Sequence, residues 1–258
     1  MNNILLQGIN FDAHSSFQQG PAKAPALIRK AFHSDSGNSY SESLDLIDNT
    51  VFHDVGDFDI DAYFDIEFIT RDNLKQAEKL LTLGGDHSIT YPIMKAYREK
   101  YESFDILQID AHSDLYHDFE GNPYSHACPF ARILENKLAD RLVQIGVRTL
   151  TPHQQEQAEK YDVEVITMQD FDPSNLPKFE RPVYLSLDMD GFDPAFAPGV
   201  SHHEPGGLST REVLRIIQSI NVPIIGADIV EYNPDRDFQE MTAYLGAKMM
   251  KEILAKMI

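Results

Sequence analysis

Short apolar runs alternate with amphipathic segments along most of the chain. The runs have the length and residue types of buried strands and lie at Ile4–Gly8, Val51–Val55, Lys79–Leu83, Phe104–Ile109, Leu142–Val147, Val163–Thr167, Val183–Leu187 and Ile224–Val230. Segments with helical spacing or helix-start signals lie at Ala24–Phe32, Thr70–Lys79, Tyr91–Tyr101, Ala127–Glu135, Pro152–Tyr161, Thr210–Ile220 and Phe238–Met257. Because strands alternate with helices, the pattern predicts a three-layer αβα fold around a mainly parallel sheet of about eight strands.

The last predicted helix carries an apolar stripe that we interpret as facing the core. Its members are Met241, Tyr244, Leu245, Met249 and Ile253. Hydrophobic residues make up 42% of the 258 residues and charged residues 24%, ordinary values for a globular protein. We therefore interpret residues 1–258 as one domain.

Several features of the sequence bear on where the protein works. No apolar run approaches the length of a membrane span, and the first basic residue is Lys23, so neither a span nor a signal peptide is predicted. The single cysteine, Cys128, cannot form an intrachain disulfide and is interpreted as a small buried residue. These observations lead us to expect a cytoplasmic protein.

The charge balance is strongly acidic. Asp and Glu number 41 against 22 for Lys and Arg, which gives a formal net charge of −19. Such a balance argues against a nucleic-acid partner, and an acidic surface would favour a cationic substrate.

Three potential metal ligands follow one of the predicted strands. The run Phe104–Ile109 leads directly into Asp110, His112 and Asp114. Side chains at every second position of an extended backbone project to one side, here at the carboxyl end of a buried strand, where open α/β sheets bind ligands. On these three residues alone, an acidic turn held by solvent is an equal alternative to a metal site.

Two other strand ends add further ligands and make a metal site the better interpretation. His87 follows Gly84-Gly85-Asp86, and two more carboxylates spaced by two follow Val183–Leu187. The complete set is His87, Asp110, His112, Asp114, Asp188 and Asp190. Because six ligands exceed the need of one four-coordinate ion, they indicate two ions that share carboxylates, a site that can activate water for hydrolysis. Phosphate chemistry fits less well, since no Gly-rich phosphate loop accompanies the ligands.

The motifs around these ligands resemble a known family, the ureohydrolases. They are Gly84–Ser88, Asp110–Asp114, Ser186–Asp190 with Asp193-Pro194, and Gly226–Glu231. The family comprises arginase, agmatinase and formimidoylglutamase, which use two manganese ions to hydrolyse C–N bonds of guanidino or formimino groups. Within it, the resemblance is greatest to plant-type arginases, through the segments Ser15–Pro21, Phe119–Asn122, Tyr124–Ala127 and Ala197–His202.

The resemblance implies a role for each site residue. One manganese ion would be held by His87, Asp110, Asp114 and Asp188, and the other by Asp110, His112, Asp188 and Asp190. His126 would shuttle protons, Glu231 would bind the guanidinium group, and Asp114 would join them in the catalytic site. Asn122 and Ser125, with Glu231, are predicted to bind substrate. A homo-oligomer, a trimer or hexamer, is also implied, whereas no role is assigned to His14, His117, His202 or His203.

These features predict a single catalytic domain that hydrolyses L-arginine to ornithine and urea. The main alternative is an agmatinase or another guanidino or formimino hydrolase. A deacetylase with a single zinc, which would need only Asp110, His112 and Asp188, and a non-catalytic homologue remain as rivals from other classes.

Overall fold

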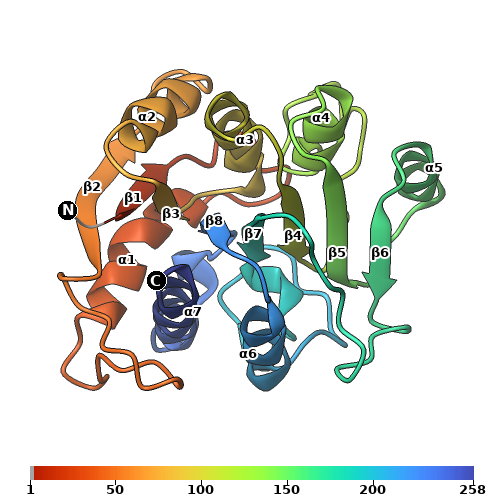
Figure 1. The fold of residues 1–258 in the computed structure, drawn as a ribbon. Helices are drawn as coiled ribbons and strands as arrows, with labels where there is room; N and C mark the ends of the chain where they lie inside the picture. Colours follow the sequence, from red (N-terminus) through yellow and green to blue (C-terminus); the bar gives the residue numbers. More distant parts are fainter. Residues whose placement is uncertain (1–2) are drawn as a thin grey trace.

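A parallel β-sheet forms the centre of the molecule (Figure 1). The structure is a computed structural model and describes residues 3–258. Its eight strands run in the order β2-β1-β3-β8-β7-β4-β5-β6. Their bounds are β1 Ile4–Asn10, β2 Phe52–Asp59, β3 Lys79–Leu83, β4 Asp105–Ile109, β5 Arg141–Val147, β6 Glu164–Thr167, β7 Val183–Asp188 and β8 Ile224–Val230. Every pairing between neighbours is parallel, which confirms the predicted sheet.

Helices cover both faces of this sheet, as Figure 1 shows. The helices are α1 Ala24–Phe32, α2 Asp65–Leu74, α3 Thr90–Lys100, α4 Pro129–Glu135, α5 Pro152–Lys160, α6 Thr210–Ser219 and α7 Met241–Met257. Four of them, α2 to α5, lie on one face, and α1, α6 and α7 lie on the other. Short 3-10 helices are found at η1 Pro21–Lys23, η2 His87–Ile89, η3 Met189–Gly191 and η4 Pro234–Arg236.

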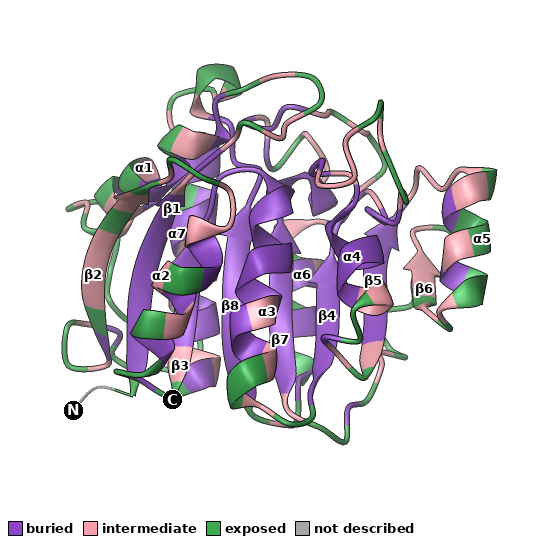
Figure 2. Cartoon of the chain, turned by 90° about the horizontal axis from the view of Figure 1, so that it is seen from above, coloured by how far each residue is buried: buried purple, intermediate pink, exposed green. Residues whose placement is uncertain are grey.

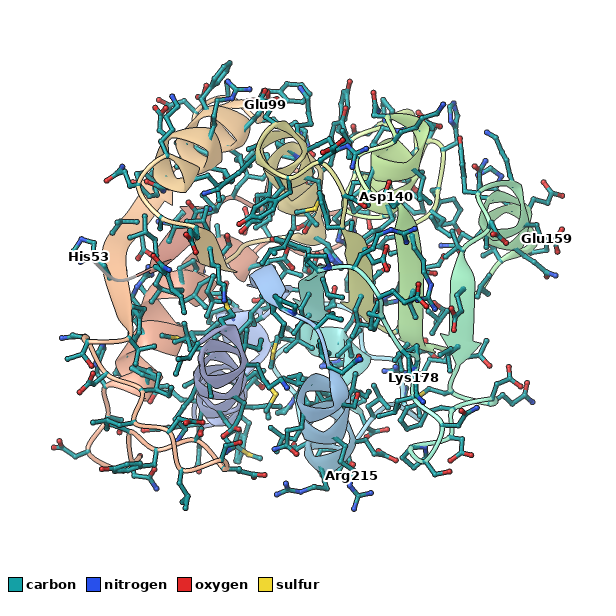
Figure 3. All side chains as sticks on the ribbon, viewed as in Figure 1. His53, Glu99, Asp140, Glu159, Lys178 and Arg215 are labelled. Carbon is teal, nitrogen blue, oxygen red and sulfur yellow. The ribbon has the colours of Figure 1, made fainter. Side chains whose placement is uncertain are left out.

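The core is divided into two layers by the sheet. Consecutive strand residues point to opposite faces, so Leu81 joins the apolar cluster beneath α1, α6 and α7, while Leu80 joins the one beneath α2 to α5. Figure 2 shows that the central strands are mostly buried and that exposed residues lie on the outer helix faces and in the loops. Exposed charged side chains such as Glu99, Glu159 and Arg215 project outward from the helices (Figure 3).

One predicted helix is displaced along the chain. The segment 70–79 was expected to be helical, but α2 begins at Asp65 and ends at Leu74. The Asp65 carboxylate accepts the backbone N–H of Ala62, and Ile66, Thr70 and Leu74 form the buried side. The prediction was wrong because Ala77, which lies after the turn at residues 75–76 that ends the helix, was counted into its apolar spacing.

The apolar stripe of α7 is only partly in the core. Leu245, Met249 and Ile253 are buried as predicted, but Met241 is 46% exposed and Tyr244 39% exposed. Both exceptions lie in the first turn of the helix, where the Tyr244 hydroxyl lies 3.1 Å from the Ser34 hydroxyl at the surface. Cys128 is buried, as expected. Among residues 3–258, the structure contains no helix with the length and apolar character needed to cross a membrane.

Candidate metal and catalytic site

The predicted metal ligands and Glu231 meet at the carboxyl ends of four neighbouring strands, β3, β8, β7 and β4. A close backbone approach brings the segment after β1 to the same edge. A Cβ on Gly85 would lie 1.6 Å from the carbonyl oxygen of Phe11, so only glycine fits there. The Asp86 N–H donates to that oxygen at 2.9 Å, which fixes the crossing.

The first group of candidate ligands surrounds the imidazole of His87. Its Nδ1 lies 3.1 Å from a carboxylate oxygen of each of Asp110, Asp114 and Asp188. Nδ1 is buried and has no hydrogen-bond partner in the described part of the chain. A buried nitrogen that faces three carboxylate oxygens is what a cation site requires.

Hydrogen bonds behind His87 determine which ring nitrogen carries the proton. The Ser186 hydroxyl donates to Asp228 at 2.7 Å and lies 2.9 Å from His87 Nε2. Because the hydroxyl has one proton and gives it to Asp228, Nε2–H must be the donor to Ser186. In the neutral imidazole, the form that binds a metal, the lone pair is therefore on Nδ1, on the side of the three carboxylates.

The second group lies beside the first and shares a residue with it. Asp110, His112 and Asp190 bring one ligand atom each within 4.8 Å of one another, and Asp110 also belongs to the group with His87 and Asp114. His112 Nδ1 is 3.1 Å from Asp190 Oδ2 and 3.5 Å from Asp110 Oδ1. The two groups thus form adjoining candidate metal sites linked through one carboxylate.

The charges of the site favour a bound cation. Burial raises the pKa of the Asp114 carboxyl to about 6, and the neighbouring charge of Asp110 acts in the same direction. Burial also raises the pKa of Asp188 well above its usual value, with the charge of Asp190 adding to the effect. Burial lowers the pKa of His87, but the surrounding carboxylates outweigh it and raise that pKa well above its usual value. Divalent cations would relieve this repulsion, and oxygen and imidazole ligands suit them.

His126 and Glu231 form a buried pair at the edge of the metal groups. His126 Nδ1 lies 2.8 Å from Glu231 Oε1, which also accepts the N–H of His87 at 2.8 Å. The Ser16 N–H donates to His126 Nε2 at 3.1 Å, and the Ser16 hydroxyl lies 2.8 Å from the same nitrogen, so Nε2 accepts here and is the nitrogen that can take up a proton. Burial lowers the pKa of His126, whereas the charge and hydrogen bond of Glu231 outweigh it and raise that pKa to about 9.

Two site residues hold a backbone conformation that is uncommon outside glycine. Asp114 has φ 51° and Glu231 has φ 63°. Each follows a strand end and turns its carboxylate toward the ligand cluster. Left-handed conformations at non-glycine residues cost free energy and often mark functional positions.

The two other predicted substrate ligands have different surroundings. The Asn122 side-chain oxygen accepts the N–H of Tyr124 at 2.9 Å, within its own turn. Ser125 is buried, and its hydroxyl accepts the N–H of Ala127 at 3.4 Å. Neither residue lines the cavity described next, so their binding role stays a prediction.

A cavity of about 230 Å³ opens beside the metal groups. Besides predicted site residues, it is lined by Ser16, Tyr116, Phe119, Ala127, Thr149, Gln154 and His202. Sequence reasoning assigned none of these a role at the site. Ser16, Phe119, Ala127 and His202 lie in the segments that carry the plant-type resemblance, which was the signal that could have indicated them. Tyr116, Thr149 and Gln154 lie outside those segments.

Asp86 was also missed, although it precedes a ligand. Its carboxylate accepts the N–H of Ser88 and, with the other oxygen, the N–H of His14 at 3.0 Å and the hydroxyl of Ser15 at 3.3 Å. The carboxylate thereby holds the segment that brings Ser16 to His126. Burial raises the pKa of Asp86 to about 7, and the charge of Glu231 acts in the same direction.

The sequence matches a profile described as the arginase family over residues 2–255. The chain belongs to the arginase family. An arginase from Medicago truncatula is 45% identical over 98% of this chain and 81% of its own length. A solved structure of an arginase from the same plant superposes with a TM-score of 0.90 at 42% identity, covering 98% of this chain and 87% of that one. These matches confirm the ureohydrolase resemblance and the plant-type similarity.

Other members of the arginase family help to place the chain. Arginase 1 of Arabidopsis thaliana is 44% identical over 97% of this chain and 80% of its own length. An agmatinase of Bacillus anthracis is 32% identical over 98% of this chain and 91% of its own length. Similarity to plant arginases is thus greater than similarity to this agmatinase.

The expectation of a cytoplasmic protein is contradicted by these relatives. The Medicago truncatula and Arabidopsis thaliana arginases are both named mitochondrial. The expectation rested partly on the single cysteine, which excludes an intrachain disulfide but carries no information about the compartment.

Proposed function

We propose that this chain hydrolyses L-arginine to ornithine and urea and that it binds two manganese ions. The observation that carries the proposal is the sharing of Asp110 between two adjoining His/Asp groups, beside the cavity that His126 and Glu231 also line. When bound, a pair of divalent cations lowers the pKa of water toward neutrality and so supplies a nucleophile for the guanidinium carbon.

Two residues that line the cavity have further roles in the proposed reaction. Glu231 is 4% exposed and presents a carboxylate to the cavity, where it would bind the guanidinium group and orient its carbon toward the metal groups. His126, with a pKa of about 9, holds a proton at neutral pH. It would donate this proton to the amine of ornithine as the C–N bond breaks.

The choice of substrate gives a direct test. We expect kcat/KM for L-arginine to exceed that for agmatine by roughly 10- to 150-fold, because losing charge-assisted contacts to the α-carboxylate costs about 1.5–3 kcal/mol. The measurement is urea release in the presence of manganese from arginine, agmatine, guanidinobutyrate and formimidoylglutamate. An agmatine value equal to or above that for arginine would make the enzyme an agmatinase.

The number of ions separates this proposal from the deacetylase rival. We expect two manganese ions per chain in dialysed protein, and we expect chelation to lower the thermal midpoint, because the clustered carboxylates then repel one another. Elemental analysis and a melting curve with and without chelator provide the measurements. A single ion per chain, or an unchanged midpoint after verified metal loss, would contradict the two-ion site.

Two further parts of the proposal concern organisation. We keep the prediction that residues 1–258 act as one catalytic domain within a homo-oligomer, a trimer or hexamer, and that no nucleic acid is bound. Light scattering coupled to size exclusion would give the oligomeric state directly.

A further inference from the structure

Arginine and agmatine differ at the end remote from the guanidinium group. Arginine carries a carboxylate and an ammonium group there, whereas agmatine carries an ammonium group alone. A site that selects arginine must therefore offer hydrogen-bond donors or positive charge to a carboxylate. Among the described residues, no Lys or Arg lines the cavity, and the charged His126 is already paired with Glu231, so neutral donors are the candidates.

Neutral donors that line the cavity differ in how far they are committed to other partners; they belong to Ser16, Tyr116, Thr149, Gln154 and His202. The Ser16 hydroxyl lies 2.8 Å from His126 Nε2, and the Thr149 hydroxyl donates to the carbonyl oxygen of Ala111 at 3.2 Å. Gln154 is 3% exposed and lines the cavity, yet its Nε2 has no acceptor within hydrogen-bond distance in residues 3–258. An amide nitrogen at the cavity wall with two unused N–H groups is available to a ligand that accepts hydrogen bonds.

The orientation of this amide is fixed by the start of α5. Thr151 is the N-cap and Gln154 the third helical residue of a capping box. Gln154 Oε1 accepts the Thr151 N–H at 3.0 Å and the Thr151 hydroxyl at 3.1 Å. A flipped amide would set Nε2–H against the Thr151 N–H, so the oxygen stays at the cap and Nε2 is the atom left for the cavity.

We propose that Gln154 is the residue that selects the α-carboxylate of L-arginine, with Thr151 as the positioning residue that holds its amide. The inference rests on the proposed arginine hydrolysis and names the contact that decides its substrate. Nε2–H can donate a hydrogen bond to a carboxylate. It cannot accept one from an ammonium group, which is itself only a donor. The N-terminus of α5 adds a favourable potential for a negative group.

The substitution Gln154→Glu tests the contact while keeping the helix start. A glutamate at this position satisfies the same capping box, so one carboxylate oxygen can remain on Thr151. The other oxygen replaces the cavity-facing N–H groups and accepts where the glutamine donated. The substrates are L-arginine, agmatine and desaminoarginine (5-guanidinopentanoate), which keeps the carboxylate and lacks the ammonium group.

We expect Gln154→Glu to lower kcat/KM for arginine and desaminoarginine by roughly 10- to 150-fold, mainly through KM. The value for agmatine should stay the same or rise, because its ammonium group meets an acceptor. Gln154→Ala should lower the values for the two carboxylate substrates and leave agmatine unchanged, which keeps the test open if the glutamate variant misfolds.

The matched control is Gln155→Glu, the same change one position along α5. The Gln155 side chain is exposed and donates to Glu159 on the helix surface. Its replacement by glutamate therefore adds the same charge without reaching the cavity. We expect this variant to retain the wild-type ratio of arginine to agmatine kcat/KM.

The outcomes separate this inference from the proposed function. If the wild-type enzyme prefers agmatine, the proposed function fails, and the assignment of Gln154 fails with it. If the wild type prefers arginine but the ratio stays the same in both Gln154 variants, the proposed function stands and Gln154 is not the selecting residue. An equal loss for all three substrates also overturns the assignment, since it indicates a structural role.

Discussion

Replacing His126 by alanine is expected to lower kcat for arginine by roughly 10²- to 10⁴-fold, the range typical of a lost general acid. The imidazole is 8% exposed and bonds Glu231 through Nδ1, which leaves Nε2 beside Ser16 as the nitrogen that exchanges a proton. Alanine removes this nitrogen while leaving the metal groups in place. KM should change little, because the proton is needed as the C–N bond breaks and not for binding.

Steady-state kinetics with the His53→Ala variant as control would measure this effect. His53 is exposed on β2 and points away from the molecule (Figure 3), so its removal tests only the loss of a histidine. Added imidazole should restore part of the activity of His126→Ala. A change confined to KM would instead make His126 a binding residue.

Glu231→Gln is expected to lower kcat/KM by roughly 30- to 5,000-fold, because removing one partner of a buried charge pair costs about 2–5 kcal/mol. The buried carboxylate of Glu231 lines the cavity, and its proposed partner is the guanidinium group. Glutamine keeps an oxygen that can accept from His87 N–H and from His126, so the fold should persist. The loss of kcat/KM therefore measures the effect of removing the negative charge of Glu231.

Thermal melting and metal content would establish that the Glu231→Gln variant is folded and loaded. Glu252→Gln is a suitable control, because Glu252 is as deeply buried, at 3% exposed against 4% for Glu231, but lies on α7 and pairs with Lys248. That variant should keep its kcat/KM. Near-normal kcat/KM in folded, loaded Glu231→Gln would remove Glu231 from the substrate site.

The strands and the metal ligands could be predicted because their signals are local. Asp110, His112 and Asp114 directly follow an apolar strand with period two, and Asp188 and Asp190 repeat the spacing. Carboxyl ends of neighbouring parallel strands share one edge, so grouping the ligands needed no knowledge of strand order.

The cavity wall could not be predicted in the same way. Ser16 reaches His126 only because Gly85 lets the segment after β1 cross the sheet edge, and Gln154 lines the cavity from α5, a helix with no ligand motif. Such contacts depend on how loops far apart in sequence pack, and spacing along the chain does not encode that. Asn122 was predicted to bind substrate because its loop follows Asp114; its side-chain oxygen accepts the Tyr124 N–H within its own turn, and its binding role stays a prediction.

The strand order also dictates when the site can assemble during folding. β8 is the last strand in the chain, yet it lies between β3 and β7. Before β8 joins, pairing between neighbours gives two separate blocks, β2-β1-β3 and β7-β4-β5-β6. Asp110, His112 and Asp190 belong to the second block, whereas His87 follows the first. One ligand group can therefore form in a folding intermediate, and the group around His87 is completed only when residues 224–230 close the sheet, late in synthesis.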